Sequence, residues 1–333
     1  MPIVPFSLSH LLLIRELGQV CVSLCPSRAW TRPCSLLWRA LMSFWAFDDE
    51  QTFTFVLDDA HRGGKRLRGV VQAIQPAARP EMTIHYLAPH LAASEEAGVV
   101  WRRLLNHVAA FAGEKGIHRV FSCAPEGSAE LEAMLGAGFS VYTREDIFRL
   151  PPDAHPQTTP PVGIRPEQDT DAWAIKQLYR AVAPHLVQQA EAIDQDLGEG
   201  WRGRRLASRA DGEGFVLTDD EGIAGYGHLA SGRAGHWLTI QVHPRVLDRV
   251  DELLDYGLAL LNYYPTRPVY CEVREYQGGV RVPLEKRGFQ YLATYCCLVR
   301  HTTVRIQEVV RSLVPALEKQ AKAPTTSVSS SHK

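Results

Sequence analysis

Residues 238–261 read LTIQVHPRVLDRVDELLDYGLALL. The part up to Val242 predicts a β-strand, and apolar residues at helical spacing from Leu247 to Leu261 predict an amphipathic helix. Enzymes often bind phosphate at such a junction, because a helix N-terminus presents unpaired N–H groups and glycine lets the backbone approach the anion. This turn contains no glycine. The sequence therefore allows two interpretations, a ligand-binding turn that works by other means or a purely structural one.

Length and composition indicate a globular protein with about two domains. The chain has 333 residues, 45% of them hydrophobic and 22% charged, and its net charge is -1. A nearly neutral chain has no overall attraction to nucleic acid or to an anionic membrane. Seven cysteines without a paired spacing favour reduced thiols over disulfides, and Cys21 with Cys25 lacks a second pair for a zinc site. We expect no bound metal and no nucleic-acid partner.

The N-terminal segment does not read as a targeting signal. Its apolar start has no preceding basic residue and is interrupted by Arg15 and Glu16, and no stretch nears the ~18 apolar residues of a membrane helix. We expect a soluble, cytoplasmic protein that does not associate with membranes.

A proline-rich linker separates two halves with the same order of elements. Residues 151–163 contain five prolines and little to bury. Pro89 corresponds to Pro244 at an offset of 155 residues, and Gly138 corresponds to Gly288 at an offset of 150, which indicates a duplicated domain. The predicted boundaries are residues 1–150 for the N-terminal domain, 151–163 for the linker, 164–302 for the C-terminal domain, 303–320 for a terminal helix and 321–333 for a disordered tail.

Each half begins its sheet with neighbouring strands and then alternates helix and strand. In the first half the strands are expected at 53–59, 67–74 and 81–89, followed by a helix over 95–116; in the second they are expected at 214–220, 222–230 and 235–244. This order predicts an α/β fold, a mixed sheet with helices on both faces, present twice as two similar sheets. The segment before Asp48 is expected to form a helix packed on the sheet.

This order resembles the GNAT (Gcn5-related) N-acetyltransferase fold, twice over. The resemblance rests on four stretches: IRPEQDTDAWAIKQLY (164–179), TIQVHP (239–244), LGAGFSVYTREDIFRL (135–150) and LEKRGFQYLATYCCLVRH (284–301). It implies two tandem GNAT-like domains and acetyl transfer from acetyl-CoA to an amine. The acceptor would be a small-molecule amine or a peptide N-terminus, and the protein a monomer or homodimer.

The resemblance also implies where the cofactor would lie, and here the sequence departs from the family pattern. The usual turn is Arg/Gln-x-x-Gly-x-Gly/Ala, but this chain has HPRVLDRVDELL at 243–254. Two arginines could meet the pyrophosphate by bidentate bonds, whereas Asp248 and Asp251 would repel it. The candidate cofactor-binding residues are Ile240, Gln241, Val242, Arg245, Val246 and Arg249. The alternative is a self-capped structural helix.

The first half departs further from the family pattern. Its turn offers Ser94 as an N-cap, with Glu95 and Glu96 in the first helical turn, and no arginine precedes them. We therefore expect a non-catalytic N-terminal half.

Three residues of the second half are candidates for catalysis. Glu272 ends a predicted strand, where α/β proteins tend to bind ligands, and is a candidate base. His243 is a second candidate base, and Tyr276 lies nearest to the tyrosine acid that the resemblance implies. The usual tyrosine before Gly-Phe is replaced by Leu284. A surface role for Glu272, or its pairing with Arg274, is the structural alternative. For the whole protein, the alternative is a catalytically silent GNAT-fold module for ligand sensing or interaction.

Overall fold

The computed structural model describes residues 3–43, 50–60, 66–76, 79–154, 161, 163–191 and 212–302. The expected terminal helix (303–320) and tail (321–333) lie outside them. Within the described residues, no helix has both the length and the apolarity needed to cross a membrane.

The N-terminal half starts with short elements and continues with three long strands before its main helix. Its elements are β1 (Val4–Pro5), α1 (Leu11–Leu17), β2 (Val22–Ser23), α2 (Pro26–Thr31), α3 (Leu36–Met42), β3 (Glu50–Ala60), β4 (Arg66–Pro76), β5 (Glu81–Ala88), α4 (Ala97–Glu114), β6 (Arg119–Pro125), α5 (Ala129–Gly136) and β7 (Ser140–Leu150).

The C-terminal half repeats the order from its first long strand onward. Its elements are β8 (Ile164–Pro166), α6 (Ala172–Val182), α7 (His185–Glu191), β9 (Gly212–Asp219), β10 (Gly222–Ser231), β11 (His236–Val242), α8 (Val250–Leu260), β12 (Val269–Arg274), α9 (Arg281–Lys286) and β13 (Gln290–His301). The predicted α/β fold with a mixed sheet is confirmed.

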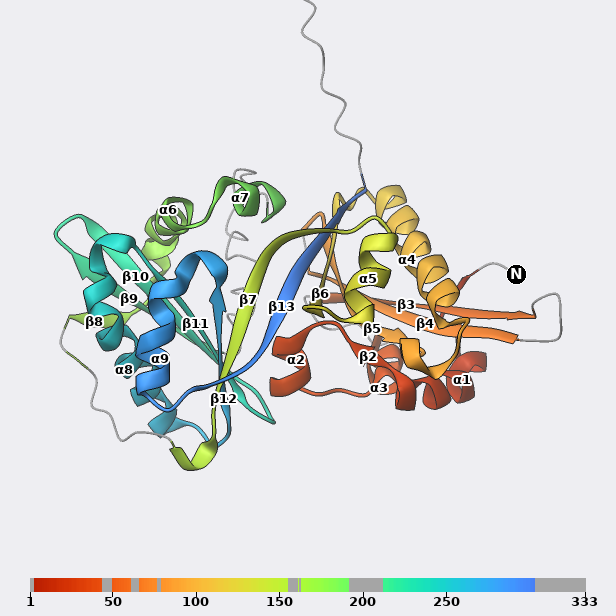
Figure 1. The fold of residues 1–333 in the computed structure, drawn as a ribbon, viewed down its shortest axis with the longest axis horizontal. Coiled ribbons are helices and arrows are strands. Elements are labelled where there is room, and N and C mark those ends of the chain that lie inside the picture. The colour runs from red at the N-terminus through yellow and green to blue at the C-terminus, as the bar shows by residue number, and fades with distance from the viewer. Residues whose placement is uncertain are drawn as a thin grey trace, which may run out of the picture. The chain divides into compact units, whose positions relative to one another are not determined.

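The described strands form one 13-stranded sheet, not the two sheets that the repeat suggested (Figure 1). The order is β1-β3-β4-β5-β6-β13-β7-β12-β11-β10-β9-β8, with β2 paired to β5. The halves merge because they exchange their last strands. Strand β13 lies between β6 and β7, and β7 lies between β12 and β13. Each half therefore fills a position in the other half's part of the sheet.

Helices cover both faces of this sheet. Phe55 and Leu57 of β3 pack with α4 in one core, whereas Val56 between them packs with α1 and α3 on the opposite face. In the second half Leu217 packs in the α8 core and Val216 in the α6 core. This alternation follows from the period of two in a strand.

In the described part of the segment before Asp48, residues 25–43 form two short helices, α2 and α3, where one was expected, and α1 precedes them. Pro33 lies between them and has no N–H to continue a helix. Ser35 then caps α3 by accepting a hydrogen bond from the Trp38 N–H at 3.0 Å. Trp30 of α2 packs on the C-terminal half, with its ring centroid 5.1 Å from that of Tyr270 on β12. Helix α2 therefore joins the two halves.

Candidate functional site

The parallel strands β11 and β12 separate before either of them ends. Their last pair is Thr239–Glu272, although both strands continue beyond it. Neighbouring residues of a strand direct their N–H and C=O groups to opposite sides. The N–H and C=O groups of Ile240 and Val242 therefore point toward β12. We call this opening the C-terminal splay. It lies at the carboxyl ends of the strands, where α/β sheets bind ligands.

One side-chain amide spans the C-terminal splay. Gln277 comes from the 3₁₀ turn η11 (Glu275–Val280) that follows β12. Its Nε2 donates to the Ile240 carbonyl at 3.0 Å, and its Oε1 accepts from the Arg274 N–H at 3.4 Å. A single amide thus bonds to both strands.

The glycine-free turn is the 3₁₀ turn η9 (Pro244–Arg249), which leads into α8. His243 caps it, because its Nδ1 accepts from the Arg245 N–H at 3.2 Å. The Val246 N–H donates to the His243 carbonyl at 3.0 Å, and the Val250 N–H donates to the Leu247 carbonyl. These N–H groups are therefore already used inside the turn.

Both arginines of the turn hold carboxylates of the same chain. Arg245 bonds Asp219 through Nε (2.6 Å) and Nη2 (3.2 Å), and Arg249 bonds Glu252 through Nε (3.0 Å) and Nη2 (2.9 Å). Hydrogen bonding from Arg245 lowers the pKa of Asp219, and hydrogen bonding from Arg249 lowers that of Glu252. A pyrophosphate at this turn would have to displace these carboxylates.

Glu272 is buried, so its surface alternative is wrong. Its side chain accepts hydrogen bonds from Trp237 Nε1 (3.1 Å) and Thr239 Oγ1 (3.3 Å). Cys271 and Val273 face the α8 core, so Glu272 lies on the opposite face of the sheet. The Glu272 carboxylate therefore lies where the C-terminal splay begins.

A buried ion pair lies on the same face, two residues after Glu272 at the end of β12. Arg274 of β12 bonds Glu191 of α7 at 2.6 Å, and the two side chains are 5% and 4% exposed. Three tyrosines complete the network. Tyr179 donates to Glu191, Tyr142 donates to Glu191 at 3.0 Å, and Arg274 Nη1 donates to the hydroxyls of Tyr179 (2.9 Å) and Tyr276 (3.0 Å). Burial raises the pKa of the Tyr179 hydroxyl well above its ordinary value. The network ties α6 and α7 to the end of β12.

The structure brings most of the predicted residues to one end of the sheet. Glu272, Tyr276 and the backbone of 240–242 surround the C-terminal splay, whereas the His243 ring serves as a cap. The prediction missed Gln277 and Glu191. Arg274 was considered as a partner of Glu272, but its salt bridge is to Glu191. Glu191 lies 83 residues from Arg274, so no local pattern in the sequence links them.

The N-terminal half has an equivalent opening, and the chain itself fills it. Strands β5 and β6 pair only as far as Thr83–Phe121. Beyond that, β2 pairs antiparallel with β5, and Leu24 lies between the strands. Its N–H donates to the His85 carbonyl of β5 at 2.8 Å, and its carbonyl accepts from the Cys123 N–H of β6 at 3.1 Å. We call residues 22–24 the N-terminal plug.

Helix α4 also begins differently from the prediction. Its N-cap residue is Glu96, without a side-chain cap, and Ser94 contributes only its carbonyl, to the Ala97 N–H at 3.2 Å. The reason is a short 3₁₀ turn, Leu91–Ala93, which is capped by His90 and delays the helix start. The expected Ser94 cap is wrong.

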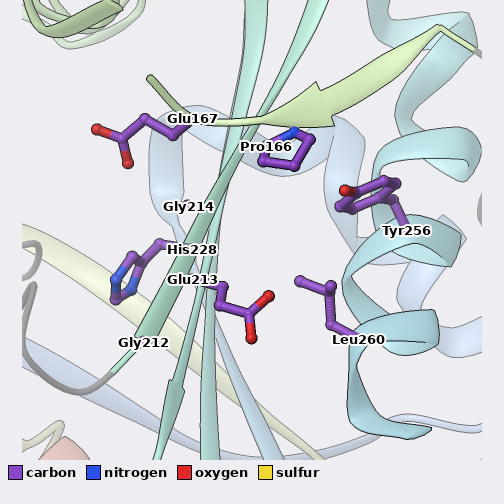
Figure 2. A pocket seen from close by; sticks show the side chains of 8 residues that line it. All are labelled: Pro166, Glu167, Gly212, Glu213, Gly214, His228, Tyr256 and Leu260. Carbon is purple, nitrogen blue, oxygen red and sulfur yellow. The ribbon is translucent and has the colours of Figure 1, made fainter. Parts of the chain in front are cut away.

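A separate pocket of about 260 Å³ lies at the edge of β9, beyond the end of β8 (Figure 2). Glu167 and His228 approach it from one side of the strands, and Glu213, Tyr256 and Leu260 from the other. Each carboxylate accepts a hydrogen bond from a tyrosine hydroxyl, Glu167 from Tyr226 at 3.1 Å and Glu213 from Tyr264 at 2.7 Å. Burial raises the pKa of Tyr264 to about 12. The two carboxylates make this pocket unfavourable for phosphate groups, which are also negatively charged.

Comparisons with known proteins identify the fold. No protein-family model matches the sequence, and no curated protein gives a significant match. The tandem GNAT protein from the clavulanic acid biosynthesis pathway, solved without AcCoA, matches 91% of this chain and 99% of its own, with 14% identity and a TM-score of 0.53. A Drosophila protein matches 90% of this chain and 98% of its own, with 11% identity and a TM-score of 0.52.

A third solved structure, a GCN5-related N-acetyltransferase from Sphaerobacter thermophilus, covers 91% of this chain and 96% of its own, with 13% identity and a TM-score of 0.48. The tandem repeat, the mixed sheet and the match to the clavulanic acid pathway protein agree with the resemblance seen in the sequence. The chain therefore has the tandem GNAT fold.

Proposed function

We propose that the C-terminal half is an N-acetyltransferase that binds acetyl-CoA in the C-terminal splay and transfers the acetyl group to an amine. One observation carries this proposal. The C-terminal splay and the N-terminal opening bond amides in the same way, and among the described residues the main chain fills only the N-terminal opening. Ile240 is the repeat equivalent of His85, at the offset of 155 residues, and both carbonyls accept an N–H from a group that also bonds the neighbouring strand.

This equivalence indicates what kind of ligand fits. The arm of coenzyme A carries two amides, and unpaired strand edges bind amide-bearing chains by adding them as a further strand. In the N-terminal half the plug takes that place, and moving it would cost its hydrogen bonds and the burial of Leu24. In the C-terminal half, within the part of the chain that the structure describes, the Gln277 side chain takes this place, and a side chain can rotate away. We infer that the C-terminal half is the active one.

The residues around the splay match the chemistry that amide formation needs. The amine nitrogen attacks the thioester carbonyl carbon, and Glu272 accepts the proton that the nitrogen loses. The Val242 N–H, which faces the splay, stabilises the negative charge on the thioester oxygen. The C–S bond then breaks and Tyr276 gives its proton to the departing thiolate, with Arg274 beside the phenolate that remains. His243 would have to leave its cap to act as the base.

Replacing Glu272 by glutamine should lower kcat about a hundredfold, because a positioned base contributes at least that factor. The KM for acetyl-CoA should change little, since the carboxylate acts on the amine. The rate is measured as release of free CoA thiol with a panel of primary amines and peptides. The control is Glu275→Gln, an exposed carboxylate on the adjacent turn, which should keep the full rate. Equal rates for wild type and Glu272→Gln would remove Glu272 from the mechanism.

The two turn arginines are proposed to bind the pyrophosphate after leaving their carboxylate partners. Arg245→Ala and Arg249→Ala should then each weaken acetyl-CoA binding by about tenfold, because charge-assisted bidentate bonds are lost. Asp219→Asn is the matched variant, since it removes one of the two carboxylates that pair with Arg245, the other being Glu221, and should keep or tighten binding. Titration calorimetry measures all three. Arginine variants that bind as tightly as the wild type would show that the arginines serve only the turn.

The remaining assignments are proposals of the same kind. The acceptor is a small-molecule amine or a peptide N-terminus that reaches Glu272 from the face that carries α6 and α7. Residues 1–150 and 164–302 act as the two domains, the N-terminal one as scaffold. The protein acts in the cytoplasm, as a monomer or homodimer.

A second candidate is a silent GNAT-fold module that binds ligands or partners without catalysis. The internal pairs Arg245–Asp219 and Arg249–Glu252 favour it, because they make the turn self-sufficient. A thermal-shift screen with acetyl-CoA, CoA and longer acyl-CoAs separates the two. Stabilisation by acyl-CoA supports the enzyme, and no shift with any of them supports the module.

A further inference from the structure

Two thiols and one carboxylate meet where the halves exchange strands. Cys123 of β6, Cys297 of β13 and Glu145 of β7 lie on three adjacent strands (Figure 1). All three are buried, and their sulfur and carboxylate oxygen atoms lie within 4.8 Å of one another. The Cys297 thiol donates a hydrogen bond to Glu145 Oε2 at 3.1 Å.

The two cysteines face each other in the geometry of a cross-strand pair. Cys297 stands directly opposite Cys123 in the antiparallel β6–β13 pairing. The Cys123 N–H points away from β13, to Leu24 at 3.1 Å, so the pair is a non-hydrogen-bonded one, whose Cα atoms are about 4.5 Å apart. That separation falls within the ~4.4–6.8 Å that a disulfide spans. Closure needs side-chain rotation rather than movement of the strands.

No other cysteine shares this arrangement. Cys296 precedes Cys297 on β13 and therefore points to the other face of the sheet. Cys271 belongs to the α8 core. None of the seven cysteines, all of which lie in the described residues, forms a disulfide in this structure.

We propose that Cys123 and Cys297 form a reversible disulfide when the protein meets hydrogen peroxide, with Glu145 as the base. Glu145 takes the Cys297 proton, and the thiolate attacks one peroxide oxygen. The O–O bond breaks, and the departing hydroxide takes the proton from Glu145, which leaves water and a sulfenic acid. The Cys123 sulfur then attacks the sulfenic sulfur, and the hydroxide that leaves takes the Cys123 proton as a second water. Two thiols lose two electrons, and one peroxide becomes two waters.

The position of the bond gives it a structural consequence. Strand β13 belongs to the C-terminal half and β6 to the N-terminal half, and their pairing is one of those that join the two. A disulfide between them closes a long loop and removes conformational freedom from the unfolded chain. The oxidised protein should therefore melt higher than the reduced one, by roughly 5 °C or more.

The experiment treats the full chain with hydrogen peroxide, blocks remaining thiols under denaturing conditions and maps the peptides by mass spectrometry. The expected result is a loss of two thiols, a single cross-link between the peptides that contain Cys123 and Cys297, and its reversal by a dithiol reductant. Cys297→Ser should abolish the cross-link. Cys296→Ser, its neighbour on the same strand, should keep it, and Glu145→Gln should slow its formation about tenfold or more.

Two results would overturn the proposal. One is that all seven thiols survive, or that the cross-link joins other cysteines. The other is that untreated protein carries one zinc or copper ion per chain and loses it in Cys297→Ser, which would make the cluster a metal site instead. Neither depends on acetyl transfer, so this test stands apart from that of the proposed function.

Discussion

Replacing Arg274 by alanine should lower the free energy of unfolding by about 3–5 kcal/mol, because it leaves the Glu191 carboxylate buried without its cation. Both side chains are at most 5% exposed, so water screens the remaining charge poorly. Tyr179 and Tyr142 donate to Glu191 but carry no charge to replace the guanidinium. We expect the loss in chemical denaturation, with helices α6 and α7 affected first.

Two further variants serve as controls for this prediction. Arg144→Ala removes an arginine whose partners Glu126 and Glu275, like itself, are about half exposed, and it should cost only ~0–1 kcal/mol. The double variant Arg274→Met with Glu191→Leu removes both charges together and should lose less stability than Arg274→Ala alone. If Arg274→Ala and Arg144→Ala lowered the free energy of unfolding equally, the buried ion pair would contribute no more than an exposed one.

Separating the two halves should prevent either from folding alone. The last strand of each half is inserted into the other half's part of the sheet. Without β13, the N-terminal half has an empty position between β6 and β7, and without β7 the C-terminal half has one between β12 and β13. Open strand edges of this kind promote aggregation. Trp30 would also lose the Tyr270 ring on which it stacks.

The measurement uses a protease site inserted between Ala154 and Pro161. After cleavage, the two fragments should elute together in gel filtration and unfold in a single transition. Each fragment expressed alone should be insoluble or lack a cooperative transition. A monomeric fragment with its own sharp transition would show that the exchange is not needed for folding.

Local sequence patterns predicted the elements but not their partners. The strands at 53–59, 67–74 and 81–89 and the helix α8 were found because alternation and helical spacing are local signals. The exchange of β7 and β13 was missed, because both strands follow a helix in the same way and their pattern does not say which neighbour they join. The plug was missed because a strand of two residues, Val22–Ser23, is too short to show a period.

In the candidate site, too, local features could be predicted from the sequence and long-range partners could not. Glu272 was chosen as a candidate because it lies near the end of a predicted strand, and ligands of α/β sheets bind at strand ends; in the structure it lies two residues before the end of β12. The absence of turn glycines suggested a self-capped helix as the alternative, and in the structure His243 caps the 3₁₀ turn η9, whereas α8 has no side-chain cap of its own. The partner of Arg245 was not predictable, since Asp219 lies 26 residues away. Gln277 could not be found either, because its role depends on how two strands diverge in space.

The most direct test of the account is hydrogen–deuterium exchange of the full chain with and without saturating acetyl-CoA. We expect slower exchange in the C-terminal splay, at residues 240–242 and 273–279, because the amides of the ligand bond these strand edges. Residues 20–24 and 84–88 should exchange at the same rate in both states, because the plug already occupies the N-terminal opening. Protection at the N-terminal opening, or no protection anywhere, would contradict the assignment of the C-terminal half as the acetyl-CoA site.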